Sequence, residues 1–237
     1  MRSTRTRSHR SHRSLVVLLA LAGFAPLLAA GAADAPGAPG ARRWKPEILP
    51  REREVAAALS AGPKSIAQEA GVYALDAHGF VLVRESRNGF HCLVQRSAPD
   101  TFEPQCLDEE GSRSILKAIL LEAERRMAGA SDAEVEAALA AAWADGRLRA
   151  PSRPGINYML STENRVPVDE SGSTIIPYRP HVMFYAPYLT NRDLGAEPMG
   201  DSPVFVIAEG NPHAYIIVPV PAETIAPHAH GGEAPGR

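Results

Sequence analysis

Residues 72–95 read VYALDAHGFVLVRESRNGFHCLVQ, and this stretch carries the clearest sign of the fold. Short runs rich in β-branched and aromatic residues, bounded by turn residues, predict three strands at residues 72–76, 80–85 and 90–95. Between the last two runs stands Asn88-Gly89, a strong hairpin signal because both residues accept a positive φ. The stretch therefore predicts a β-meander.

Three helices are expected around these strands. Residues 51–60 place Val55 and Leu59 on one apolar stripe, and residues from 112 or 114 to 127 repeat apolar side chains at helical spacing. A third helix opens at Ser131, which forms a capping box with Glu134, and closes at Gly146.

Further strands complete the expected fold. Between Cys92 and Cys106 we expect a loop, because the segment holds Pro99 and Pro104. Strand-like segments follow the helices at residues 156–160, 174–176, 181–186, 204–208 and 213–218. The plan predicts a single α+β domain with a mainly antiparallel sheet and two or three helices packed on one face.

The amino-terminal residues 1–33 are typical of a cleavable signal peptide. Five arginines without an acidic residue precede an apolar run from Leu15 to Leu28, and small residues lead to Asp34. The run is shorter than the ~20 residues that span a bilayer, so we expect no stable membrane anchor after cleavage. The prediction is an exported protein, periplasmic or extracellular.

The rest of the chain divides into three parts. Residues 34–50 are rich in Ala, Pro and Gly, which predicts a flexible leader. Residues 51–220 are expected to form the domain, and residues 221–237 are expected to form a disordered tail.

The chain has 25 basic and 27 acidic residues, and residues 1–33 hold five of the basic ones, so the remainder carries a net charge of −7. A mildly acidic protein has no electrostatic reason to bind nucleic acid.

The two cysteines, Cys92 and Cys106, fall in the exported part. In an oxidising compartment two nearby thiols normally pair, and their spacing is wider than the C-x-x-C of redox-active pairs. We expect a structural disulfide. A zinc site would need two more ligands from elsewhere in the chain.

Segments at residues 88–92, 104–108, 158–160, 180–183 and 210–220 together resemble a group of small exported bacterial proteins to which no function is assigned. The resemblance covers about residues 55–220. It implies one exported domain in which Cys92 pairs with Cys106, and it implies no substrate, cofactor or catalytic residue.

One predicted strand carries the candidate site. Alternate residues of a strand share a face, so His181, Met183 and Tyr185 point one way, and Val182, Phe184 and Ala186 point the other way and resemble core. His213 and Tyr215 repeat the His–Tyr pattern. If the two strands are neighbours, His181 and His213 converge with Tyr158. The ligand-binding candidates are therefore His181, Tyr185, His213, Tyr158 and Met183.

Familiar catalytic motifs are missing. The sequence has no P-loop, dinucleotide-binding turn, H-E-x-x-H or G-x-S-x-G, and it suggests no cofactor or resident metal. Whether the protein is an enzyme stays open. The favoured hypothesis is a domain that binds a small molecule or a protein partner.

Two alternatives remain. One is a cofactor-free hydrolase with His181 or His213 as general base. The other is periplasmic metal handling, because His181 and Met183 together present ligands that suit copper. A metal site would need three or more converging ligands from His91, His181, Met183 and His213.

Overall fold

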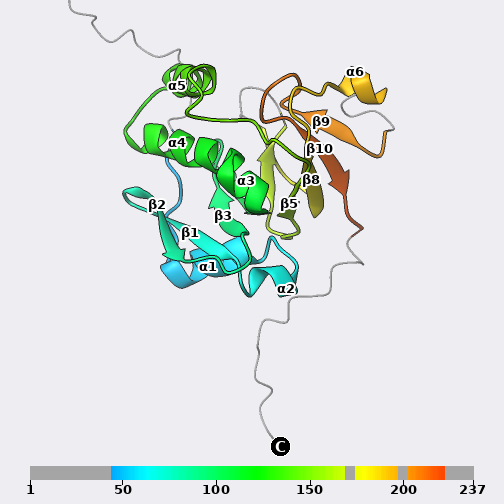
Figure 1. Cartoon of the computed structure of the whole chain (residues 1–237). Helices are drawn as coiled ribbons and strands as arrows, with labels where there is room; N and C mark the ends of the chain where they lie inside the picture. The colour runs from blue at the N-terminus through cyan, green and yellow to red at the C-terminus, as the bar shows by residue number, and fades with distance from the viewer. Residues whose placement is uncertain (1–43, 169–173, 197–201, 222–237) are drawn as a thin grey trace, which may run out of the picture. The chain divides into compact units, whose positions relative to one another are not determined.

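The computed structural model describes residues 44–168, 174–196 and 202–221. The predicted signal peptide, most of the predicted leader and residues 222–237 of the predicted tail lie outside these residues. Within them the chain forms an α+β domain around one eight-stranded sheet (Figure 1). No helix in the described ranges is long and apolar enough to span a membrane.

The large sheet has the order β2-β1-β3-β4-β5-β8-β10-β9. Its strands are β1 (Gly71–Asp76), β2 (Gly79–Arg84), β3 (His91–Gln95), β4 (Glu103–Leu107), β5 (Ile156–Met159), β8 (His181–Tyr185), β9 (Phe205–Ile207) and β10 (Tyr215–Pro219). A separate hairpin consists of β6 (Arg165–Pro167) and β7 (Ile175–Pro177). The helices are α1 (Arg51–Leu59), α2 (Lys64–Ala67), α3 (Glu109–Arg113), α4 (Ile115–Met127), α5 (Asp132–Ala144) and α6 (Asn191–Leu194).

The predicted meander is wrong in its third strand. β1 and β2 form the expected antiparallel hairpin, but β3 pairs with β1 in parallel, with Gly71 opposite His91. Gly71 makes this approach possible, because a Cβ there would lie 2.5 Å from the His91 ring. The central position of β3 buries Leu93 and Val94, whereas β2 at the sheet edge leaves Val81 41% exposed. Burial on both faces therefore outweighs the local hairpin signal.

The expected loop between the cysteines is also wrong in part. Residues from Glu103 to Leu107 form β4, antiparallel to β3, and place Cys106 directly opposite Cys92. β4 pairs with β5 only at Cys106 and Leu107, so Pro104 stands where the strand has a single partner. A proline without an N–H is tolerated at such a place.

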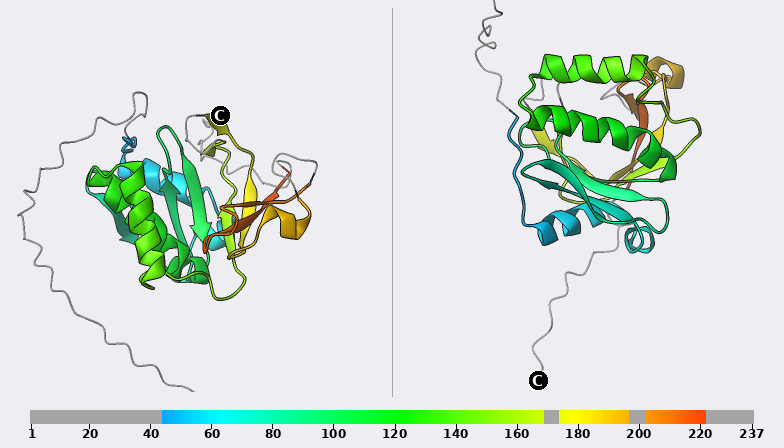
Figure 2. Two further views of the ribbon diagram at one scale, coloured as in Figure 1. Left: turned by 90° about the horizontal axis from the view of Figure 1, so that it is seen from above. Right: turned by 60° about the vertical axis from the view of Figure 1, so that its left-hand side comes forward.

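Helices cover both faces of the sheet (Figure 2). α4 packs on one face through a buried cluster with Leu93, Leu107 and Met183, and α5 packs on α4. α1 covers the opposite face, in a cluster with Val72, Val94 and the disulfide. The α+β class and the mainly antiparallel sheet are confirmed, and α1 lies on the face opposite α4.

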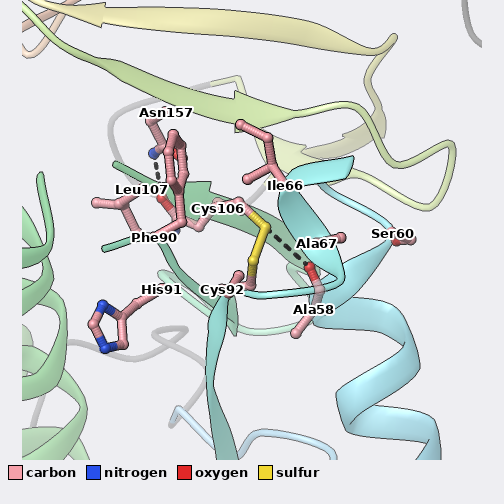
Figure 3. The surroundings of a disulfide bond; sticks show 12 residues. Ala58, Ser60, Ile66, Ala67, Phe90, His91, Cys92, Cys106, Leu107 and Asn157 are labelled. Atoms are coloured by element: carbon pink, nitrogen blue, oxygen red, sulfur yellow. Dashed lines mark hydrogen bonds between the residues drawn. A yellow bond between two sulfur atoms is a disulfide. The ribbon is translucent and has the colours of Figure 1, made fainter. Parts of the chain in front are cut away.

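The Cys92–Cys106 disulfide is present and fully buried under α1 (Figure 3). The carbonyl of Ala58 lies 3.6 Å from Cys106 Sγ. Gly62, three residues after the end of α1, also lies against the disulfide, and a Cβ at this position would come within 3.1 Å of Cys106 Sγ. The end of α1 is therefore fitted against the disulfide.

Local signals placed the helices well. The capping box at Ser131 and Glu134 is present, and Gly146 takes the positive φ (78°) expected just beyond α5. The second expected helix is α4, which begins at the later of its two predicted starts, with Ser114 as its N-cap; the short helix α3 before it was not predicted. Asp108 begins α3 by accepting a hydrogen bond from the Gly111 amide.

Candidate functional site

The side chains expected to line a pocket on β8 are core residues. His181, Met183 and Tyr185 share a face, as predicted, but they are 2%, 5% and 6% exposed. Phe184, expected in the core, is 40% exposed. The assignment of the two faces is therefore wrong, because the α4 side of the sheet buries Met183 and Tyr185 with Met159, Tyr215 and Ile217.

His181 is held by the backbone. Its Nδ1–H donates to the carbonyl of Arg179 at 2.9 Å, and Tyr178 contacts the ring edge-on with 5.0 Å between ring centroids. Burial lowers the pKa of His181. Among the described residues, no carboxylate or hydroxyl is hydrogen-bonded to His181, so its geometry offers the hydrolase hypothesis no oriented base.

His213 lies at the other end of the same strand pair. In the β8–β10 register Tyr215 is opposite Tyr185, four residues or about 13 Å of strand from His181, and His213 lies beyond Tyr215 in the turn before β10. The predicted convergence of these histidines is wrong. His213 stacks on Trp143 of α5 at 5.8 Å, and its buried Nδ1 has no hydrogen-bond partner in the described part of the chain.

Tyr158 and Tyr185 occupy opposite faces of the sheet. Tyr158 pairs with Val182, the outward neighbour of His181, and stacks on Phe90 at 6.2 Å. The Tyr185 hydroxyl donates to the carbonyl of Ile156 at 3.0 Å. The five candidate residues therefore do not form one site.

The described residues offer the copper hypothesis no cluster of histidine, cysteine and carboxylate ligands. His181 and Met183 share a buried face, but the described ranges contain no group of three or more His, Cys, Asp and Glu residues able to hold a metal ion.

A hollow of about 450 Å³ lies between α1, α2 and the end of β2. Ala56, Leu59 and Lys64 help to line it, and none of the five candidates does.

One histidine–hydroxyl contact was not predicted. His91 Nδ1 lies 3.0 Å from Ser112 Oγ, and Ser112 Oγ can donate to the carbonyls of Gly89 at 3.2 Å or Leu107 at 3.3 Å. With its proton directed to the backbone, Ser112 accepts from His91, an arrangement that ties α3 to β3. The two residues are far apart in sequence, and no local pattern joins them.

The outward side of β5, β8 and β10 is apolar throughout. Two rows of three residues follow from the strand register, one centred on Phe184 and one on Val182. We call these six residues the open strip: Ile156, Tyr158, Val182, Phe184, Ile216 and Val218.

No described helix packs over the open strip. Of its six residues only Tyr158 packs against a buried cluster, the one under α1. α1 lies against β1, β3 and β4, to one side of β8 and β10 (Figure 1). The segment that joins α1 to α2 borders the strip, since Leu160 just after β5 donates its amide to the Ala61 carbonyl, and Ile66 of α2 lies next to β5 (Figure 3).

No protein-family model matches the chain, and neither the curated proteins nor the solved structures give a match. The function has to be argued from the chain's own geometry.

Proposed function

We propose that this chain is an exported protein-binding domain and that the open strip is its binding surface. The observation that carries the proposal is the composition of the strip. An antiparallel sheet with one face in water alternates apolar and polar residues, yet all six outward positions here are apolar. Phe184 is exposed and the other five are half-buried. A contiguous apolar patch that water can reach on a folded domain is typical of an interaction site.

The remaining segments of the mature chain are poor candidates to cover the strip. Residues 222–237 contain one large aliphatic side chain, Ile225, and residues 34–43 contain none. The two internal segments at 169–173 and 197–201 add only Met199. Such compositions cannot supply an apolar face of matching size, so a separate chain is the better occupant.

A protein partner is favoured over a small molecule. The residues first considered for a ligand, His181, Met183 and Tyr185, are packed in the core. The open strip is a surface of three neighbouring strands, which suits a flat contact with another protein.

Export is supported by the order of residues 1–33, in which a basic segment is followed by an apolar run and then by small residues.

Site-specific photo-crosslinking in the producing cell tests the binding surface. A photoreactive phenylalanine analogue at Phe184 is expected to form a covalent adduct with a protein. The same analogue at Leu194, similarly exposed on α6, is the control and is expected to form none. Equal labelling from both positions, or none from Phe184, would contradict the proposal.

Mass spectrometry of the exported protein tests the export step. A chain that begins near Ala33 or Asp34 and is about two daltons lighter than the reduced chain is expected. A purified chain that retains residues 1–33 would contradict cleavage.

A further inference from the structure

The eight-stranded sheet ends in β2 on one side and in β9 on the other (Figure 1). The outer side of an edge strand has main-chain N–H and C=O groups that no neighbouring strand bonds. At β9 a buried side chain takes the place of a neighbour. The carboxamide of Asn191 donates to the Val206 carbonyl at 2.8 Å and accepts from the Val206 amide at 2.7 Å. The β9 edge is therefore closed by the chain itself.

The β2 edge has no such closure among the described residues. The amide of Leu75 on β1 does not bond β2, since it donates to the Glu54 carboxylate at 3.5 Å. In an antiparallel pair such a residue faces a partner whose own N–H and C=O point outward, and this partner is Phe80. Leu82, two residues further along β2, has the same orientation. In the described part of the chain neither main chain is hydrogen-bonded on its outer side.

The composition of β2 does nothing to protect this edge. Residues 79–83 read GFVLV, without the charged residues or proline that usually keep an edge strand from pairing. Val81, between the two outward positions, is 41% exposed. The outward groups of Phe80 and Leu82 form what we call the free edge. Main-chain groups arranged in this way are complementary to an extended strand.

We infer that the free edge pairs with the free edge of a second copy of this chain, antiparallel and around a two-fold axis at Val81. In this register Phe80 lies opposite Leu82 of the partner subunit, and Leu82 opposite the partner's Phe80. Each of these pairs exchanges two main-chain hydrogen bonds. Beyond Val83 the register shifts and Arg84 pairs with Val72, so the free edge ends there. Sliding the partner by two residues would therefore leave free groups unmatched.

The strand is its own complement, which favours a second copy over another protein. The two outward positions stand symmetrically about Val81, so an identical strand satisfies both at once, and the exposed Val81 of each copy covers its counterpart. Self-complementary two-fold contacts are the commonest form of oligomer. Because Asn191 closes the β9 edge, the joined sheet cannot add a third copy in the same way. The contact is small, which predicts a weak and reversible dimer.

Sedimentation velocity of the purified exported protein tests the dimer. The mean mass of the wild type is expected to rise with concentration from monomer to dimer and no further. Val81→Lys places two like charges opposite each other at the axis and should weaken the dimer by about tenfold or more. Ile207→Lys on β9, where the side chain is 37% exposed, is the matched control and should dimerise like the wild type. Circular dichroism checks that both variants are folded.

A cysteine at the axis tests the register. In the inferred pairing the two Val81 residues form a non-hydrogen-bonded pair with Cα atoms about 4.5 Å apart, within the range that a disulfide spans. Val81→Cys is therefore expected to form a covalent dimer under mild oxidation. Ile207→Cys, equally accessible on the closed edge, should stay monomeric under the same conditions.

Three results would overturn the inference. A wild type that stays monomeric would do so and would leave the free edge for a strand of another protein. Assemblies larger than a dimer, or equal cross-linking of Val81→Cys and Ile207→Cys, would exclude the two-fold pairing. The inference goes beyond the proposed function and does not depend on the open strip, whose role is decided separately by the crosslink from Phe184.

Discussion

Glu54 of α1 and Arg96, just after β3, form an ion pair that is sealed from water. The guanidinium donates to both carboxylate oxygens, at 2.8 and 2.7 Å, and the side chains are 0% and 3% exposed. Arg96 also donates to the carbonyl of Val94 and lies over the Phe102 ring. The pair joins α1 to the sheet across 42 residues of sequence.

Removing one partner of this pair should be costly. Glu54→Gln leaves the Arg96 charge buried without its counter-charge, and we expect the free energy of unfolding to fall by about 3–5 kcal/mol. Glu163→Gln, which breaks the exposed pair with Arg53, should change it by about 1 kcal/mol or less. Urea unfolding measures both. A similar small effect in the two variants would show that water reaches Glu54.

The reversed faces of β8 can be tested at two adjacent residues. Met183→Ala removes a buried side chain and should cost about 2–5 kcal/mol. Phe184→Ser changes an exposed side chain and should cost far less, about 1 kcal/mol. Denaturant midpoints compare them. A larger loss in Phe184→Ser would mean that Phe184 is buried after all.

The fit of Gly62 against the disulfide predicts a coupled effect. Gly62→Ala should destabilise by about 1–3 kcal/mol, because its Cβ would approach Cys106 Sγ to 3.1 Å. In a Cys92→Ala and Cys106→Ala background, itself weakened by about 3 kcal/mol, the same change should cost less. A double-mutant cycle measures the difference. Additive effects would exclude the contact.

Glu103 should make the protein less stable at high pH. Burial raises the pKa of Glu103 to about 7, although hydrogen bonds from Ser97 and Thr101 act to lower this pKa. The folded state therefore binds this proton more tightly than the unfolded state. The stabilisation that comes from this bound proton is complete below about pH 4.5 and is lost as the pH rises through about 7. Between these two pH values the free energy of unfolding of the wild type should fall by about 1–3 kcal/mol, and Glu103→Gln should abolish this fall. Urea midpoints across the range measure it, and an unchanged slope would refute it.

His181 should act in the opposite direction. Burial lowers its pKa, so the contribution of the neutral ring is present above the unfolded value of 6.5 and is lost as the pH falls below it. His181→Gln should reduce the loss of stability on acidification, measured by urea unfolding at successive pH values. His78→Gln in the exposed β1–β2 turn is the control and should leave the acid slope unchanged. Equal slopes in wild type and His181→Gln would contradict the burial argument.

Features encoded by neighbouring residues were predictable. The capping box at Ser131, the β1–β2 hairpin and the alternation along β8 each depend on a few consecutive residues. The pairing of Cys92 with Cys106 followed from expected export and was confirmed, although β4 itself was missed because Pro104 argues against a strand.

Features set by distant contacts were not predictable. Alternation identifies which residues of β8 share a face, but the choice of the buried face depends on Met159, Ile217 and α4. The parallel pairing of β1 with β3 likewise depends on which strand is buried on both faces. For the candidate site, the two strands are neighbours, as the convergence hypothesis required, but their antiparallel register carries His213 away from His181.

The Glu54–Arg96 pair also bears on the order of folding. During synthesis the residues of α1 are made before Arg96. Until Arg96 follows, the Glu54 carboxylate has no partner, and docking of α1 on the sheet would bury an unpaired charge. α1 should therefore settle on the sheet only after β3 is in place, which makes its docking a late step with a long loop to close. A chain that emerges amino-terminus first would meanwhile expose the alanines of α1, and a pause in synthesis before residue 96 would prolong this exposure.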